Sequence, residues 1–185
     1  MLLLFKGIGS YYNANSMSKE LGISHVGAQK ILKRLSKDGL LISKRIGKSI
    51  VYKPKLDDDY VRKLFAFILA DEAHNYKRWK EEFKGLSKGD RVIMLFGSAV
   101  RNYAKAGDID IMIVMEEGEL NDVKAVIKEK RKMLPKNIHS IELTADDLIG
   151  NINDGNKAII DAIKGAIILY GQDKYVEAIK DVTRL

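Results

Sequence analysis

The stretch that most constrains this chain is RVIMLFGSAVRNYAKAGDIDIMIV, residues 91–114. Its pattern predicts an apolar strand, a turn at Gly97-Ser98, a short helix, a loop, and a second strand with a long apolar run. Asp108 and Asp110 are two residues apart in that second strand, so both side chains should project from the same face, with Ile109, Ile111 and Ile113 facing the other way into a core.

A pair of carboxylates on one strand face predicts a cation site. The two charges repel each other unless a cation lies between them. Mg²⁺ takes oxygen ligands, commonly one or two carboxylates together with substrate phosphates. Gly97 has no Cβ, so a phosphate can approach its backbone. Ser98 can cap the following helix, whose first N–H groups suit an anion. The stretch therefore predicts a site for a metal–triphosphate pair, unless the two aspartates simply lie on a solvated strand face.

The spacing of these residues carries a family resemblance. Gly-Ser, nine residues, then DID between apolar runs resembles the signature of the nucleotidyltransferase superfamily, and especially of the minimal nucleotidyltransferases, over roughly residues 88–175. Arg101 stands where many members have an arginine. Asn102 departs from a frequent glycine, and Gly107 departs from a frequent serine.

The resemblance implies an activity and a set of roles. Members transfer a nucleoside monophosphate from a nucleoside triphosphate (NTP) to a hydroxyl group, with a two-metal Mg²⁺ site. Asp108 and Asp110 would bind the metal. Gly97 and Ser98 would hold the phosphates, and Arg101 would offset developing negative charge.

The resemblance also implies a third carboxylate on the strand that follows. Residues 138–143, IHSIEL, predict that strand. Glu142 is the candidate by position, as a catalytic residue and metal ligand; an exposed strand glutamate is the alternative interpretation. Further on, residues 156–171, NKAIIDAIKGAIILYG, predict an apolar helix, and the string KGAIILYG resembles a late helix of minimal nucleotidyltransferases.

The positive charge of the chain is unevenly distributed. Residues 1–55 contain 11 Lys/Arg and 2 Asp/Glu, which gives +9, whereas residues 56–185 contain 21 and 23, which gives −2; the sum is the net charge of +7. This asymmetry favours a basic module for nucleic acid beside a near-neutral module. An ordinary solvated basic surface is the alternative.

The basic part predicts a helix over residues 16–21, a second helix over 25–38, and two strands over 40–46 and 50–53. Ile23 is expected to anchor the core, and Ser24 to cap the second helix. The buried face of that helix is expected to comprise Ala28, Ile31, Leu32 and Leu35.

This order of elements resembles the winged helix-turn-helix domains of bacterial and archaeal transcription regulators. In that arrangement the second helix enters the major groove of DNA. The resemblance implies base contacts from His25, Val26, Gly27, Gln29 and Lys30, and phosphate contacts from Lys33, Lys44, Arg45 and Lys48. A protein–protein module is the alternative.

Between the two modules, residues 58–84 contain neither glycine nor proline and predict one long helix. Its apolar stripe includes Val61, Phe65 and Leu69. The helix is a candidate spacer and a candidate dimerisation surface, because winged-helix regulators usually read two half-sites as dimers. The stripe could instead pack within its own chain.

Together these observations predict a two-domain α+β/α/β protein. The chain is expected to begin with a winged helix (1–55). A linking helix (56–87) follows, and then a nucleotidyltransferase domain with a mixed sheet (88–185). The absence of cysteine excludes disulfides and thiolate metal sites. No apolar run is long enough to span a bilayer, so a cytoplasmic protein without a membrane partner is expected.

The expected function is a DNA-binding protein, homodimeric by analogy with such regulators, with a Mg²⁺-dependent nucleotidyltransferase domain. One alternative is a transcription regulator whose second domain only binds nucleotide or is degenerate. Another is a transferase whose acceptor is a partner protein.

Overall fold

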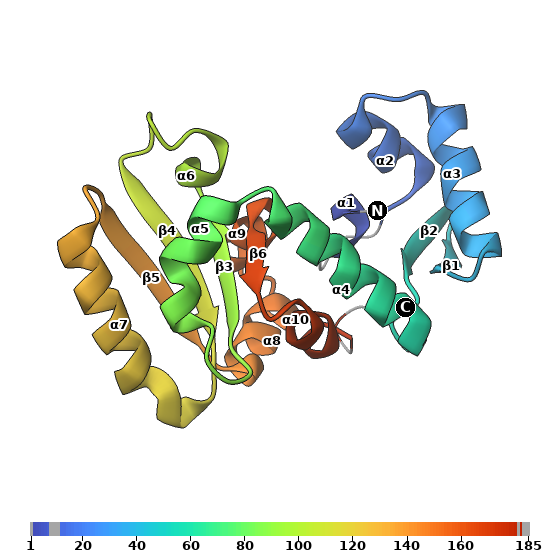
Figure 1. The fold of residues 1–185 in the computed structure, drawn as a ribbon. Helices are drawn as coiled ribbons and strands as arrows, with labels where there is room; N and C mark the ends of the chain where they lie inside the picture. The colour runs from blue at the N-terminus through green and yellow to red at the C-terminus, as the bar shows by residue number, and fades with distance from the viewer. Residues whose placement is uncertain (1, 8–11, 181, 183–185) are drawn as a thin grey trace.

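The N-terminal part of the chain consists of three helices and a hairpin (Figure 1). The computed structural model describes residues 2–7, 12–180 and 182. Helices α1 (Leu2–Lys6), α2 (Ala14–Leu21) and α3 (His25–Lys37) precede the antiparallel strands β1 (Leu41–Ile46) and β2 (Ser49–Pro54). A single antiparallel bridge between Tyr12 and Tyr52 joins the start of α2 to the hairpin. The helices and strands predicted in this region are confirmed.

Local capping explains where α2 and α3 begin. Asn13 and Ser16 form a reciprocal capping box at the start of α2. The Ser24 hydroxyl accepts a hydrogen bond of 3.0 Å from the Gly27 backbone N–H, as expected for an N-cap. The predicted burial is wrong at two positions, because Ile23 is 37% exposed and Ile31 is 45% exposed. The core of so small a unit covers only a narrow stripe of α3.

The predicted long helix is broken, and it is not a free spacer. Helix α4 (Asp59–His74) ends at Asn75, and α5 (Lys77–Phe83) and a 3₁₀ turn (Lys84–Leu86) follow. The Asn75 side chain donates to the carbonyl of Asp71, which satisfies a terminal carbonyl of α4. The break lets the chain bury α4 and α5 on opposite faces of the sheet, which a straight helix could not do.

The C-terminal part is built on a four-stranded mixed sheet, as predicted. Strands β3 (Val92–Phe96), β4 (Asp108–Val114), β5 (Asn137–Leu143) and β6 (Ile167–Tyr170) lie in the order β5-β4-β3-β6. Strand β3 runs antiparallel to both neighbours, whereas β4 and β5 are parallel. Helix α7 (Leu120–Met133) connects this parallel pair, after a 3₁₀ turn at Glu117–Glu119.

Each face of the sheet is covered by its own set of helices. Met94 and Met112 face a core that includes Phe65 and Leu69 of α4. The same core takes in residues of α8 (Ala145–Asn153), α9 (Lys157–Gly165) and α10 (Gln172–Ala178). Residues of β3 and β4 on the other face pack with α5 and α7. The stripe considered for dimerisation is therefore buried inside its own chain.

The apolar helix predicted over residues 156–171 is wrong in its second half. Helix α9 ends at Gly165, and the chain continues as β6, hydrogen-bonded to β3. Ile167, Ile168 and Leu169 are 4%, 1% and 0% exposed. An apolar run with β-branched residues that is buried on both faces suits a strand better than an amphipathic helix.

Among the residues that the structure describes, no helix combines the length and the apolar character that crossing a membrane requires.

Candidate active site

The end of β3 brings the chain into the candidate site. Phe96 is the last residue of the strand, and Gly97 has φ 75° and ψ −153°, a region that favours glycine. The four-residue helix α6 (Ser98–Arg101) begins directly afterwards. Ser98 does not cap this helix, contrary to expectation: Gly97 occupies the N-cap position, and no side-chain capping hydrogen bond is present there.

Gly97 also makes room for one of the two aspartates. Asp110 pairs with Phe96 across the antiparallel β3–β4 ladder, so its side chain projects beside the turn. A Cβ atom built on Gly97 would collide with Oδ2 of Asp110 and lie 3.1 Å from its Cγ. The turn and the carboxylate therefore depend on each other sterically. This explains in physical terms why glycine stands before the helix.

A residue that the sequence did not indicate completes the carboxylate pair. In the parallel β4–β5 ladder, Asp110 is paired with His139. The His139 Nδ1 atom lies 3.1 Å from Oδ2 of Asp108 and 3.7 Å from Oδ1 of Asp110. One ligand atom from each of the three side chains lies within 4.8 Å of the other two, so the group could hold a metal ion.

Glu142 is not brought to this site, which corrects its predicted role as third carboxylate. It is paired with Ile113 in the β4–β5 ladder. Because Ile113 and Asp110 are three residues apart on β4, they face opposite sides of the sheet. Glu142 therefore projects toward the face away from both aspartates.

Burial and charge act together on Asp110. Its side chain is 21% exposed, against 36% for Asp108 and 64% for His139. Burial raises the pKa of the Asp110 carboxyl, and the negative charge of Asp108 raises this pKa further, while His139 lowers it. Within residues 2–7, 12–180 and 182, neither aspartate has a Lys or Arg nitrogen within ion-pair distance.

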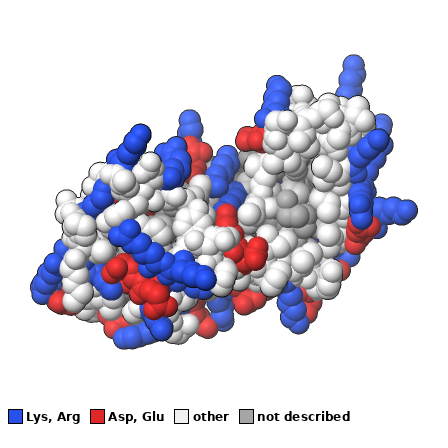
Figure 2. All heavy atoms as spheres, turned by 45° about the horizontal axis from the view of Figure 1, so that its top comes forward, with Lys and Arg blue, Asp and Glu red and all other residues white. Residues whose placement is uncertain are grey.

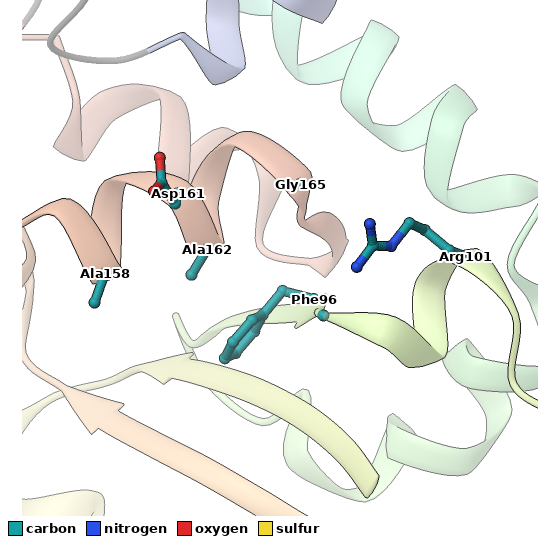
Figure 3. A pocket seen from close by; sticks show the side chains of 7 residues that line it. Phe96, Arg101, Ala158, Asp161, Ala162 and Gly165 are labelled. Carbon is teal, nitrogen blue, oxygen red and sulfur yellow. The ribbon is translucent and has the colours of Figure 1, made fainter. Parts of the chain in front are cut away.

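A cavity opens beside the turn, on the same side of the sheet as the aspartates. Its volume is about 410 Å³. Phe96, Gly97 and Arg101 line it from β3 and α6, and α9 supplies the opposite wall with Ala158, Asp161, Ala162 and Gly165. Figure 3 shows the Arg101 guanidinium reaching from α6 toward the end of α9. The structure thus brings Gly97, Arg101 and Asp110 to one region of the molecule.

The loop between α6 and β4 is held by one aromatic ring. Tyr103 packs edge-on against Trp79 of α5, with 5.2 Å between the ring centroids. The Arg78 guanidinium carbon lies 4.2 Å from the centre of the Tyr103 ring, and the Lys136 ammonium lies 4.8 Å from it. Lys136 also donates a hydrogen bond to the carbonyl of Ala106. These contacts fix the chain just before Asp108.

The residues predicted to contact DNA lie on α3 and the hairpin. His25, Gln29 and Lys48 line one groove of about 280 Å³. Gly27 is half-buried, and its N–H is used by the Ser24 cap. The remaining predicted residues, Lys30, Lys33, Lys44 and Arg45, are exposed. Figure 2 shows Lys and Arg side chains along the margin of this part of the molecule.

Comparison with known proteins identifies the family. A family model described as a nucleotidyltransferase domain matches residues 76–170, from the residue before α5 to the last residue of β6. Comparison with curated proteins and comparison with solved structures gave no match. The matched region contains the Gly97 turn, both aspartates and the β5 strand, and it covers more than half of the chain. The chain therefore belongs to the nucleotidyltransferase domain family.

Proposed function

We propose that the C-terminal domain transfers a nucleoside monophosphate from an NTP to a hydroxyl acceptor, with release of pyrophosphate. The observation that carries this proposal is the steric fit between the Gly97 turn and Asp110, next to an open cavity of about 410 Å³. A half-buried carboxylate pair without a Lys or Arg partner among the described residues suits a divalent cation. The family match supports nucleotidyl transfer in general.

The residues of this chain would have distinct roles. Asp108 and Asp110 hold a divalent ion, which would neutralise charge on the attacking and leaving oxygens. The backbone of Gly97 and the hydroxyl of Ser98 bind the β- and γ-phosphates. Arg101 lines the same cavity and offsets the negative charge that grows on the phosphates. Phe96 and the small residues of α9 then provide an apolar surface for the nucleoside.

The direct test is a titration of the purified protein with ATP, GTP, CTP and UTP in the presence of a divalent ion. Both nucleotide binding and pyrophosphate release are measured. Release that is abolished in the double variant Asp108→Ala, Asp110→Ala supports the transferase. Nucleotide binding without release, with protein and nucleic acid fractions offered as acceptors, favours a nucleotide-responsive regulator. A protein fraction that restores release favours a partner protein as acceptor.

The N-terminal part supports a second function, binding to duplex DNA as a winged helix-turn-helix. The specific observation is that His25 and Gln29 of α3 share a groove with Lys48 of the hairpin. Gln29 can pair with adenine, and the exposed methyl groups of Val26, which is 58% exposed, can contact thymine. Lys30 can reach guanine, and Lys33, Lys44 and Arg45 would reach phosphates on either side.

Charge reversal tests the DNA proposal. The variant Lys30→Glu, Lys33→Glu should weaken duplex binding and reduce the slope of log affinity against log salt by about 1, for the lost phosphate contact of Lys33. The matched control is Lys124→Glu, Lys128→Glu, which makes the same charge change on exposed positions of α7. Equal losses in both variants would indicate nonspecific attraction. Absence of duplex binding at low salt would make the unit a protein-contact module.

A homodimer that reads two half-sites is part of this proposal. Because the apolar stripe of α4 is buried in the core of its own chain, it cannot also form the dimer contact. Tyr60 and Phe67 lie on the outer side of α4 and are 68% and 67% exposed. They are seven residues apart, so they share one helix face, which makes that face the candidate contact.

A further inference from the structure

The strand pairing places an imidazole where the metal site would otherwise have only oxygen ligands. Asp110 and His139 are register partners in adjacent parallel strands, so their side chains leave the sheet on the same face. Asp108 belongs to the same face of β4, two residues away. His139 approaches both carboxylates through one nitrogen, at 3.1 Å and 3.7 Å. The site is thus defined by one nitrogen and two carboxylate groups.

We propose that His139 is a direct ligand of the metal held by Asp108 and Asp110, and that the site binds first-row transition ions more tightly than Mg²⁺. This inference rests on the proposed function for its choice of site. It goes further in naming a third ligand and the class of ion.

The chemistry of the donor set leads to this preference. Mg²⁺ is a hard cation that takes oxygen ligands and loses its waters reluctantly. Imidazole nitrogen suits softer first-row ions, and affinity for a mixed nitrogen and oxygen site rises from Mn²⁺ through Co²⁺. An imidazole in the third position therefore contributes little to Mg²⁺ binding and much to binding of these ions. The affinity order expected for this chain, from weakest to tightest, is Mg²⁺, then Mn²⁺, then Co²⁺.

The surroundings of the three side chains are consistent with direct ligation. All three ligand atoms lie within 4.8 Å of one another, close enough for one ion to contact them together. In the part of the chain that the structure describes, His139 is the only basic side chain within 4.0 Å of either carboxylate. His139 is also 64% exposed, so an ion can reach the site without unfolding of the strand.

A simple ion pair is the competing explanation for this geometry. A protonated His139 would neutralise part of the aspartate charge without any metal. The two explanations differ in one measurable respect, because only ligation places an imidazole nitrogen in the coordination shell of a bound ion.

The first experiment measures ion binding rather than activity. The full chain is freed of metal with a chelator and titrated calorimetrically with Mg²⁺, Mn²⁺ and Co²⁺ in the absence of nucleotide. Pulsed electron paramagnetic resonance of the Mn²⁺ complex then reports any ¹⁴N nucleus bonded to the ion. The expected result is Mn²⁺ affinity above Mg²⁺ affinity, Co²⁺ affinity above both, and a ¹⁴N coupling of imidazole strength.

Two substitutions of His139 test the preference for Mn²⁺ over Mg²⁺, one by removing the imidazole and one by replacing it with a carboxylate. His139→Ala should lower Mn²⁺ affinity by at least about tenfold, since losing even a residue that only orients a ligand costs about 10–100-fold. It should also remove the ¹⁴N coupling and leave Mg²⁺ affinity nearly unchanged. His139→Asp supplies a third carboxylate, so it should raise Mg²⁺ affinity and narrow the gap between the two ions.

The matched control comes from the same strand. Glu142→Gln changes the carboxylate that sequence position favoured, but its side chain faces the other side of the sheet. Its ion affinities should equal those of the native protein. A loss of Mn²⁺ binding in Glu142→Gln with none in His139→Ala would overturn the proposal and restore Glu142 as the ligand.

Other outcomes separate this inference from the proposed activity. Tighter Mg²⁺ than Mn²⁺ binding, a bound Mn²⁺ without ¹⁴N coupling, or no binding of any of the three ions would each refute His139 as a ligand. Pyrophosphate release that persists in such a case would keep the transferase. Conversely, the expected ion preference without pyrophosphate release from any NTP would keep the ligand set and remove the transferase.

Discussion

Replacing Gly97 with alanine is expected to destabilise the protein by about 2–6 kcal/mol. Part of this cost is local strain, because φ is 75° and ψ is −153°, a backbone region that costs other residues about 1–3 kcal/mol. The rest is steric. The new methyl group would collide with Oδ2 of Asp110 and approach its Cγ and Cβ to 3.1 and 3.3 Å. Overpacking of this kind costs about 1–3 kcal/mol.

A double-mutant cycle separates the two contributions. Asp110→Ala removes the carboxylate that the methyl group would strike and leaves only the 3.3 Å approach to the Cβ of residue 110, so in that background Gly97→Ala should cost mainly the backbone strain. The coupling free energy between the two substitutions is expected to be about 1–3 kcal/mol. Unfolding of the metal-free protein in urea, followed by circular dichroism, measures all four variants. Most of the range of the expected loss lies below the stability of an average domain, about 5–15 kcal/mol, and the urea curves show directly whether each variant is folded in water.

The cycle has a clear refuting result. If Gly97→Ala costs the same free energy whether residue 110 is aspartate or alanine, then the turn and the carboxylate are sterically independent. The steric explanation for glycine at position 97 would then be wrong. A cost below about 1 kcal/mol in both backgrounds would also contradict the strained backbone conformation.

Three further expectations concern charge and the surface. Because the folded-state pKa of Asp110 is raised, its contribution to the stability of the metal-free protein is present below the ordinary carboxyl pKa and lost as pH rises through the raised value; Asp110→Asn should flatten that pH dependence in urea unfolding. The ion pair between Lys6 and Glu72 is mostly buried, with side chains 10% and 17% exposed. Breaking a fully buried ion pair costs about 3–5 kcal/mol of folding free energy. Because this pair keeps some exposure to solvent, Lys6→Ala should lower the stability by an amount at the lower end of that range, and an unchanged melting temperature would contradict this. Phe67→Glu should shift the molecular mass measured by light scattering from dimer to monomer if the outer face of α4 forms the dimer contact, and a dimer that survives would exclude that face.

Much of the fold can be predicted because its signals are local. Ser24 caps α3 as expected, by a hydrogen bond to a residue only three positions further along the chain. The periodicity of residues 120–134 predicts α7, and the alternation of IHSIEL predicts β5. Each of these signals requires only neighbouring residues, so no knowledge of the tertiary fold is needed.

Prediction from the sequence fails where the tertiary fold overrides local pattern. Residues 58–84 have the pattern of one helix, but the sheet has two faces to cover. The break at Asn75 lets α4 pack on one face and α5 on the other. The run that begins at Ile167 resembles a continuation of α9, but the open edge of β3 takes it as a strand. Ile31 fits the periodic stripe of α3, yet the N-terminal core is too small to cover it.

The candidate site, too, can be predicted only in part from the sequence. Gly97, Asp108 and Asp110 lie within one short stretch, so sequence spacing alone indicates that they belong together. His139 is separated from Asp110 by the whole of α7, and its place depends on the register of two parallel strands. The apolar alternation of β5 fixes which face His139 takes, but it does not say which residue of β4 lies opposite His139.

Two features decide that His139, and not Glu142, lies beside the aspartates: the alternation of side chains along β5 and the burial of its apolar residues. The two residues are three apart on β5, so one faces the aspartates and the other does not. His139 shares its side of the strand with Ile141 and Leu143, which pack against the same core as Met112 of β4. Placing Glu142 beside the aspartates would turn those two apolar side chains to the opposite face and bring Ile138, now 1% exposed, out of its own core. Full burial of an aliphatic side chain such as Ile138 is worth about 1.5–3 kcal/mol, and a typical hydrogen bond contributes about 0.5–1.5 kcal/mol, so the packing of Ile138 favours the observed register. The alternation of apolar residues therefore places an imidazole, and not a third carboxylate, beside Asp108 and Asp110.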